Sequence, residues 1–156
     1  MTARPHPGGP AGPIFFLVRH GRAEAQAPGG GGDEARRLTA AGREAFAASA
    51  AALARQHQVT RIVTSPLVRA RQTAALLAEA TGAPVEVDRR LASGASSGAD
   101  LLALGRSLGP GVALVGHNPE LGEAVALAGA GAVEVPPGTV AAVGKDGRLR
   151  WVRSRW

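Results

Sequence analysis

Short apolar runs alternate along the chain with longer stretches in which apolar residues recur at helical spacing. Six runs of strand length are predicted to form β-strands: Ile14–Val18, Arg61–Thr64, Pro84–Asp88, Val112–Val115, Thr139–Val143 and Arg148–Val152. The continuous apolar character of Ile14–Val18 is typical of a strand that is buried on both faces. The last two runs are joined through Lys145-Asp146-Gly147, a sequence that predicts a hairpin.

Helices are predicted between these runs. They extend from Thr39, as the N-cap, to about His57, from Ser65 to Ala80, from Ala99 to Leu108 and from Glu120 to Ala128. The first helix has a predicted buried stripe at Phe46, Ser49, Ala50 and Leu53. Ser65 followed by Pro66 fits an N-cap and a first helical position, and Gly82 is placed for a left-handed C-cap.

The alternation of strands and helices predicts a single-domain α/β fold, a three-layer α/β/α sandwich around a mostly parallel central sheet. We expect this domain to span residues 14–156, because the Pro- and Gly-rich residues 1–13 are typical of a flexible leader. The Gly-rich stretch Pro28–Gly32 is predicted to be a mobile loop. It is not predicted to bind phosphate through its backbone, since no Gly-Lys-Ser/Thr follows it.

Polar residues follow two of the apolar strands, and in parallel sheets ligands bind beyond the carboxyl ends of the strands. Arg19, His20 and Gly21 come directly after the first strand, and His117 and Asn118 follow the strand at Val112–Val115. If these two strands are neighbours, both imidazoles lie at one edge of the sheet. The sequence therefore predicts a ligand site at this edge.

The residue types at this edge suit an anionic ligand. The guanidinium of Arg19 presents a fork of donors that matches phosphate oxygens, a neutral His20 has a lone pair for nucleophilic attack, and Gly21 lets the backbone approach a ligand. Arg69 lies near the start of a predicted helix, where the helix dipole disfavours a cation unless an anion is bound there. Arg71 points about 200° away around the helix and is predicted to be solvated.

The net charge of the chain adds little to the prediction of an anion site at this edge of the sheet. The 156-residue chain has a formal net charge of +6, which by itself favours an anionic partner such as nucleic acid, a membrane surface or a phosphorylated ligand. Only Lys145 among the 18 basic residues is Lys, so we interpret most of the arginines as a compositional bias of the surface. Phe15 and Phe16 belong to a predicted core strand, which leaves no aromatic and basic surface for base stacking. No nucleic-acid partner is expected.

Composition also limits the kinds of catalytic or metal site that the chain can form and the cellular location that we expect. The chain has no Cys, which excludes disulfides, a thiol nucleophile and Cys-ligated metals. No apolar run approaches the roughly 18 residues of a membrane span, and the first residues lack the apolar segment of a signal peptide. We therefore expect a cytoplasmic protein without a membrane partner.

Three motifs together resemble the histidine phosphatase superfamily, whose fold is phosphoglycerate mutase-like. They are Arg19-His20-Gly21, Ser65-Pro66-x-x-Arg69-Ala70-x-Gln72-Thr73 and Gly116-His117-Asn118-Pro119. The short length and Arg37-Leu38-Thr39-x-x-Gly42 resemble its small SixA-like phosphohistidine phosphatase branch. The resemblance implies that His20 becomes phosphorylated, that Arg19, Arg69 and His117 hold the phosphoryl oxygens, and that Gly21 and Asn118 belong to the binding pocket. No metal or other cofactor is expected.

One departure from larger members of the superfamily bears on the substrate. Many of them carry a Glu or Asp general acid after the third strand, whereas Leu91–Ala99 contains no carboxylate and Asp100 stands at a predicted helix start, where it could act as a cap. Without an acid an alkoxide leaves poorly, but a protonated phosphohistidine leaves as neutral imidazole. We therefore expect a monomeric phosphatase acting on a phosphorylated protein, a phosphotransfer domain or a phosphocarrier.

Two alternatives remain open at this stage. The first is a phosphomonoesterase of the same superfamily, acting on a small phosphorylated substrate. The second is a protein that binds phosphate or nucleic acid without catalysis, which would show a steep dependence of its affinity on salt.

Overall fold

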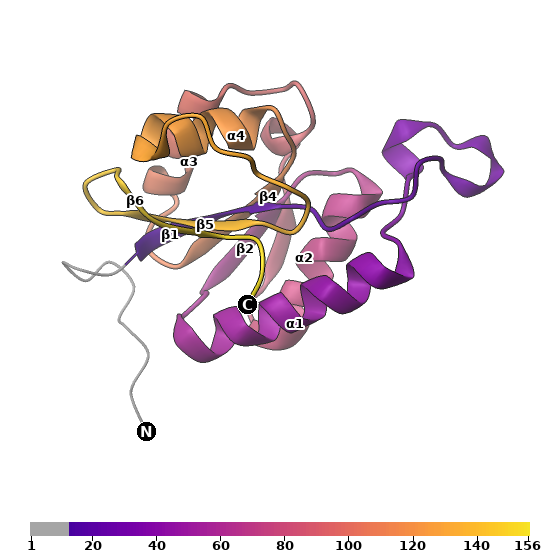
Figure 1. The fold of residues 1–156 in the computed structure, drawn as a ribbon, viewed down its shortest axis with the longest axis horizontal. Helices are drawn as coiled ribbons and strands as arrows, with labels where there is room; N and C mark the ends of the chain where they lie inside the picture. Colours follow the sequence, from indigo (N-terminus) through magenta and orange to yellow (C-terminus); the bar gives the residue numbers. More distant parts are fainter. Residues whose placement is uncertain (1–12) are drawn as a thin grey trace.

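A six-stranded sheet separates two pairs of helices in the computed structural model, which describes residues 13–156 (Figure 1). The strands are β1 (Pro13–Arg19), β2 (Arg61–Thr64), β3 (Val85–Val87), β4 (Val112–Gly116), β5 (Val140–Gly144) and β6 (Leu149–Arg153). The helices are α1 (Ala40–Gln56), α2 (Val68–Thr81), α3 (Gly98–Ser107) and α4 (Glu120–Val125). Helices α1 and α2 cover one face of the sheet and α3 and α4 the other, which confirms the predicted three-layer sandwich.

The sheet is mostly parallel, as predicted. Its order is β3-β2-β4-β1-β5-β6, with β1 to β4 parallel and with β5 and β6 forming an antiparallel hairpin at one edge. In β1, Phe15 and Leu17 pack in the cluster beneath α3 and α4, whereas Phe16 and Val18 pack with α1 and α2. Both faces of β1 are therefore buried, which explains its continuous apolar run.

Local signals fix the ends of the two helices on the first face. Thr39 is the N-cap of α1, and its hydroxyl accepts a hydrogen bond from the backbone N–H of Gly42 at 2.8 Å. The four residues of the predicted stripe on α1 are buried. Gly82 ends α2 in the left-handed conformation with φ of 76°, where a Cβ would be strained. These three predictions are confirmed.

The predicted start of α2 is wrong. The helix begins at Val68 with Leu67 as its N-cap, and Ser65 and Pro66 lie in the turn before it. The hydroxyl of Ser65 accepts from the backbone N–H of Leu67 at 3.2 Å, so it closes this turn and does not cap the helix. Asp100, by contrast, does have a capping role, because its carboxylate and the Ser97 hydroxyl form a capping box at the start of α3.

Other boundaries shift for local reasons. Pro13, expected in the leader, is the first residue of β1, and the rest of the leader lies outside the described residues. The last predicted helix is α-helical only to Val125 and then widens into a π-helical turn at Ala126–Ala130. The stretch predicted as a mobile loop forms a short 3₁₀ turn at Pro28–Gly30, followed by a second at Asp33–Ala35. Between residues 13 and 156, no helix has the length and apolar character needed to cross a bilayer.

Candidate active site

The two histidines of the motifs meet at the carboxyl edge of the sheet. Strands β1 and β4 are parallel neighbours with Arg19 in register with Gly116, so the residues that follow them emerge together. The rings of His20 and His117 have their centroids 5.1 Å apart. A cavity of about 370 Å³ at this point is lined by Arg19, His20, Arg22, Ala23, Asp33, Arg36, Arg69, Ser93, His117, Asn118 and Pro137. The sequence prediction that the imidazoles share one edge is confirmed.

His20 is held as a neutral imidazole whose Nε2 carries the lone pair. Its side chain is buried, and Nδ1 lies 2.7 Å from the carbonyl oxygen of Gly21. Because a carbonyl only accepts, Nδ1 carries the proton and Nε2 carries the lone pair. Burial lowers the pKa of His20 to about 4; the Gly21 carbonyl opposes this shift, and the nearby cations, chiefly Arg69, add to it. The imidazole is therefore a ready nucleophile at neutral pH.

Arg69 is the buried cation nearest to that lone pair. Only 4% of the residue is exposed, and its Nε donates to Nε2 of His20 at 3.4 Å. The anion that the sequence predicts near the start of this helix is supplied by the chain itself. Nη1 of Arg69 donates to the carbonyl oxygen of Asp33 at 2.8 Å, and Nη2 donates to its carboxylate at 3.1 Å. Arg71, two residues further on, is exposed, as predicted.

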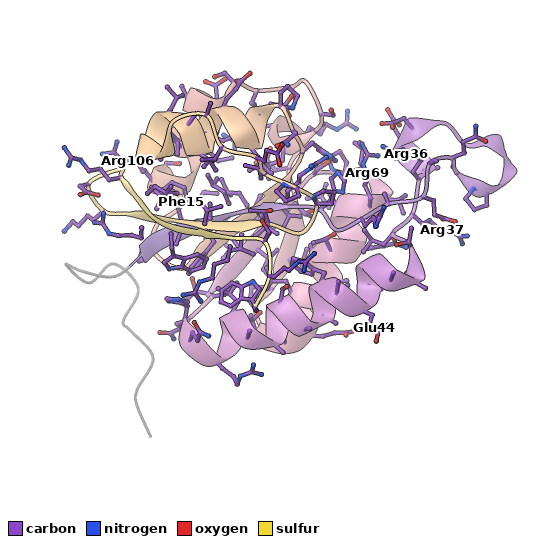
Figure 2. The ribbon with its side chains drawn as sticks, in the orientation of Figure 1. Phe15, Arg36, Arg37, Glu44, Arg69 and Arg106 are labelled. Carbon is purple, nitrogen blue, oxygen red and sulfur yellow. The ribbon has the colours of Figure 1, made fainter. Side chains whose placement is uncertain are left out.

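Asp33 and Arg36 were not identified from the sequence. Nε of Arg36 donates to the Asp33 carboxylate at 2.9 Å, so that carboxylate bridges two arginines of the cavity. Partial burial acts to raise the pKa of Asp33, but the charge and hydrogen bonds of Arg69 and Arg36 outweigh it and lower the pKa. Figure 2 shows Arg36 and Arg69 close together where the segment after β1 projects beyond the sheet.

Arg19 and Asn118 meet at the backbone of Val135. Nη1 of Arg19 and Nδ2 of Asn118 both donate to the Val135 carbonyl oxygen, at 2.8 and 3.0 Å. The amide oxygen of Asn118 accepts from the N–H of Gly122, so both ends of this amide are engaged by the protein. Nε of Arg19 is buried without a partner in the described part of the chain. Burial and the charge of Arg69 lower the pKa of Arg19, so an anion in the cavity would relieve this cation.

Gly21 lies beside the cavity and not in its lining. Its N–H donates to the hydroxyl of Thr73 at 2.9 Å, and that hydroxyl donates to the carbonyl of Arg69. A Cβ at Gly21 would lie 3.3 Å from Leu38, so the missing side chain allows close packing against the chain before α1. The geometry thus gives Gly21 a packing role, and its approach to a ligand stays a prediction.

His117 is bonded through one nitrogen only. Its Nε2 lies 2.7 Å from the hydroxyl of Ser65, and its Nδ1 is buried with no partner among residues 13–156. Burial, followed by His20 and Arg69, lowers the pKa of His117 to about 3. The sequence predicts a helix cap at Ser65 and not a partner for His117. The signal for that partner is the position of Ser65 directly after β2, by the same strand-end rule that locates the two histidines.

Carboxylates near the cavity are already engaged. Ser93 comes from the segment after β3, and the acids close to that segment serve its backbone: Glu120 accepts from the N–H of Gly94 at 2.8 Å and Glu123 from that of Gly98 at 3.2 Å. Asp33 is the carboxylate in the cavity lining, and its lowered pKa makes it a poor acid. Within the described residues, no group of three or more His, Asp or Glu side chains could hold a metal ion.

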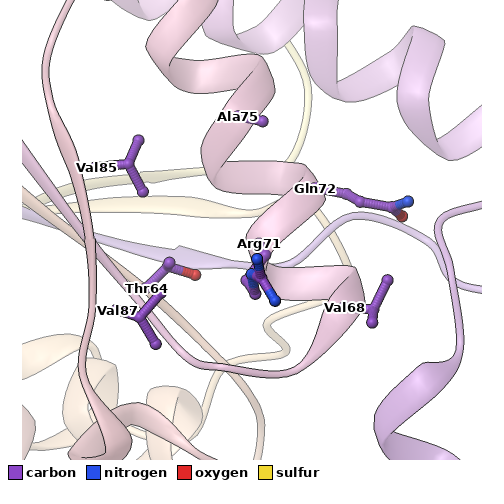
Figure 3. A pocket seen from close by; sticks show the side chains of 7 residues that line it. All are labelled: Thr64, Val68, Arg71, Gln72, Ala75, Val85 and Val87. Atoms are coloured by element: carbon purple, nitrogen blue, oxygen red, sulfur yellow. The ribbon is translucent and has the colours of Figure 1, made fainter.

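A larger hollow lies apart from the histidines. It measures about 610 Å³ and runs between α2 and the edge strand β3 (Figure 3). Val85 and Val87 of β3 border it on one side, and Arg71 and Gln72 are among the α2 residues that line it. None of the predicted site residues lines this hollow.

Comparisons with known proteins identify a family. The family model described as histidine phosphatase superfamily (branch 1) matches residues 15–94, a span that includes His20 and Arg69. No curated protein sequence matches the chain.

Several solved structures share the fold. The structure of the protein histidine phosphatase SixA complexed with tungstate is 24% identical with a TM-score of 0.77, covering 88% of this chain and 94% of that one. The putative phosphohistidine phosphatase SixA from Agrobacterium tumefaciens is also 24% identical, with a TM-score of 0.79 and coverage of 92% and 99%. A mycobacterial glucosyl-3-phosphoglycerate phosphatase is 22% identical, with a TM-score of 0.65 and coverage of 92% and 100%.

Proposed function

The chain belongs to the histidine phosphatase superfamily, and we propose that it is a phosphatase that hydrolyses phosphohistidine on a protein partner. The observation that carries the proposal is the state of His20. Its Nδ1 is tied to the Gly21 carbonyl and its pKa lies at about 4, so Nε2 presents a lone pair inside a cavity lined by arginines. Such a cavity attracts a phosphoryl group and places a nucleophile next to it.

The hydrogen-bond donors of the other cavity residues suit them to hold or to support a phosphoryl group. Arg19 and His117 each have a buried nitrogen without a partner in the described residues, and Arg69 donates to His20 and Asp33, with which a phosphoryl oxygen would compete. Cationic donors stabilise the charge that spreads over the phosphoryl oxygens during transfer. Asn118 supports Arg19 through their shared contact with Val135. Gly21 supports Arg69 through Thr73. We give these last two residues a supporting role in phosphate binding.

The proposed reaction has two displacements at phosphorus. In the first, Nε2 of His20 forms a bond to phosphorus while the bond from phosphorus to the substrate nitrogen breaks, and the substrate imidazole leaves neutral because its other nitrogen is protonated. In the second, water attacks the phosphorus of phosphorylated His20, releasing phosphate and restoring the imidazole. Neither step needs an acid to expel an alkoxide, which suits a cavity whose carboxylate is held ionised by Arg69 and Arg36.

The partner follows from the same chemistry. We propose a phosphorylated phosphotransfer domain or phosphocarrier as the substrate. We also propose that the enzyme is a monomer, that it acts in the cytoplasm, and that it uses no metal or other cofactor. The likeness in fold to the protein histidine phosphatase SixA and to a putative phosphohistidine phosphatase SixA supports this class of substrate.

The test is release of phosphate from a phosphotransfer domain phosphorylated on histidine. The wild-type chain is expected to release phosphate and to carry an acid-labile phosphoryl group on His20 when the reaction is quenched. His20→Ala should do neither, whereas His57→Ala, which changes a histidine outside the cavity, should retain turnover. Phosphate release by His20→Ala at the wild-type rate would overturn the assignment of the nucleophile.

A small phosphomonoester is the second candidate, and the likeness to a glucosyl-3-phosphoglycerate phosphatase favours it. A panel of sugar and nucleotide phosphates decides between the two. Turnover of any of these well above that of phosphohistidine would replace the first proposal. Absence of turnover on all of them, together with salt-dependent binding of DNA or RNA, would favour a binding protein.

A further inference from the structure

We propose that Ser65 is a positioning residue that keeps the proton of His117 on Nδ1, where it can be donated to a phosphoryl oxygen. The inference rests on the proposed function for the identity of the ligand. It concerns Nδ1 of His117, which must be a donor if it is to hold a phosphoryl oxygen, and Ser65, for which the sequence predicts a helix cap.

The backbone fixes Ser65 against the turn that carries His117. Ser65 follows the last residue of β2, and β2 pairs in parallel with β4 with Thr64 opposite Val115. The N–H of Ser65 donates to the carbonyl of Val115 at 3.0 Å, which extends the ladder by one bond. The Ser65 side chain is completely buried, and its hydroxyl oxygen lies 2.7 Å from Nε2 of His117.

Counting protons assigns the direction of this hydrogen bond. A serine hydroxyl has one proton to donate and two lone pairs to accept with. One lone pair of Ser65 accepts the N–H of Leu67 at 3.2 Å. If Nε2 of His117 donated to the other, the hydroxyl proton would be buried with no acceptor in the described part of the chain, which is costly. With Ser65 as the donor and Nε2 as the acceptor, the Ser65 hydroxyl, Nε2 and the N–H of Leu67 are all paired, and Nδ1 of His117 is the one group left without a partner in the described part of the chain.

The direction at Nε2 decides what Nδ1 offers to the cavity. A neutral imidazole carries one proton, so when Nε2 accepts, Nδ1 must hold it. Nδ1 is buried without a protein partner, and the ring lines the cavity beside Arg19 and Arg69. An N–H at this position would pair with a phosphoryl oxygen, whereas a lone pair would repel it. The unpaired donor is therefore the atom that a phosphoryl group would satisfy.

A purely structural role for Ser65 makes a different prediction. Its contact with Leu67 shapes the turn before α2, and loss of that contact alone would lower stability without changing the tautomer of His117. The two roles are separated by reading the proton on the imidazole directly. That measurement needs no substrate, so it stands even if phosphohistidine is not turned over.

The experiment combines ¹⁵N NMR of the histidine side chains with kinetics. In the wild-type chain at neutral pH, the His117 spectrum is expected to show a protonated Nδ1 and an unprotonated Nε2. Ser65→Ala should shift the tautomer toward protonated Nε2 and weaken the binding of inorganic phosphate. It should lower kcat/KM on a phosphohistidine protein by about 100-fold, the lower end of the loss typical of one donor to a developing charge. Ser65→Thr, which keeps the hydroxyl, should restore the tautomer and much of the activity.

Ser49→Ala is the matched control, because Ser49 is also buried but bonds only to the carbonyl of Ala45 within α1. It should leave the spectrum, phosphate binding and turnover unchanged. A wild-type spectrum with the proton on Nε2 overturns the proposal, as does Ser65→Ala with an unchanged tautomer. A wild-type chain that shows the expected tautomer and binds phosphate, yet does not act on phosphohistidine, contradicts only the proposed function.

Discussion

The carboxylate of Asp33 accepts a hydrogen bond from Nη2 of Arg69 at 3.1 Å, so the cavity proposed to receive a phosphoryl anion already contains a negative charge. This ion pair balances a guanidinium that is otherwise buried. The Asp33 side chain is 61% exposed and belongs to a short turn preceded by glycines. An incoming phosphoryl group therefore competes with Asp33 for the donors of Arg69.

Asp33→Asn is expected to tighten the binding of inorganic phosphate by about 10-fold. The amide keeps an acceptor for Arg69 and the backbone contact stays, but the repulsion between carboxylate and dianion is lost. For a carboxylate this exposed, at about 6 Å and a water-like dielectric constant of about 80, that repulsion is about 1.4 kcal/mol. Isothermal titration at low and high salt would measure it, with Asp146→Asn in the β5–β6 hairpin as a control for net charge. Weaker binding by Asp33→Asn would mean that the charge holds Arg69 in place.

Arg69→Lys is expected to lower kcat/KM by about 10²- to 10³-fold, although the charge is kept. Lysine lacks the fork that reaches His20 through Nε and Asp33 through both Nη atoms, so a donor aimed at the phosphoryl group is lost. Arg71→Lys makes the same change on the exposed side of α2 and should retain wild-type turnover. Equal effects of the two substitutions would contradict the role given to Arg69.

Much of the fold follows from local signals in the sequence. The order of strands and helices, the Thr39 cap and the left-handed Gly82 depend on neighbours in the chain, and each is predictable without knowledge of the rest. The start of α2 is not, because Ser65 has an alternative partner in His117, which is 52 residues away. A hydroxyl that can cap a helix is drawn into a tertiary contact, and the helix begins two residues after Pro66 as a result.

The candidate site divides in the same way. His20 and His117 are predictable because each follows a strand, and the parallel pairing of β1 and β4 brings them together. Asp33 and Arg36 are not, since they come from a turn between elements and no periodic pattern specifies where that turn folds. Their position depends on the hydrogen bonds from Arg69 and on the ion pair between them, which are visible only in three dimensions.

Stability is expected to fall as the pH is lowered from 7 to 5. Burial lowers the pKa of His20 to about 4 and that of His117 to about 3, against 6.5 for an exposed imidazole. The unfolded chain takes up these protons near pH 6.5 and the folded chain does not, so acid favours unfolding, and each histidine costs about 2 kcal/mol by pH 5. Burial also lowers the pKa of His57, with the same sign.

Urea unfolding at pH 7, 6 and 5 measures this loss. In His20→Asn the fall in unfolding free energy between pH 7 and pH 5 should be about 2 kcal/mol smaller than in the wild-type chain, because one of the buried imidazoles is gone. The window lies above the range in which the Asp33 and Asp100 carboxyls titrate, because hydrogen bonds and, at Asp33, neighbouring arginines lower the pKa of both from 3.8. A fall of the same size in both chains would show that His20 titrates normally in the folded state.

Gly105→Ala is expected to destabilise the fold, although alanine is the better helix former. Gly105 lies in α3 against the sheet, and a Cβ there would come within 2.4 Å of the ring of Phe15, which is fully buried in β1 (Figure 2). Overpacking of this kind costs about 1–3 kcal/mol, against which the gain in helix propensity returns about 1 kcal/mol.

Gly122→Ala in α4 is the matched substitution, since its Cβ would meet Asn118 at 3.7 Å, an ordinary contact, and it should be neutral or slightly stabilising. Urea unfolding of both variants compares them directly, and a Gly105→Ala chain as stable as the wild type would mean that α3 can move away from the sheet without loss of packing.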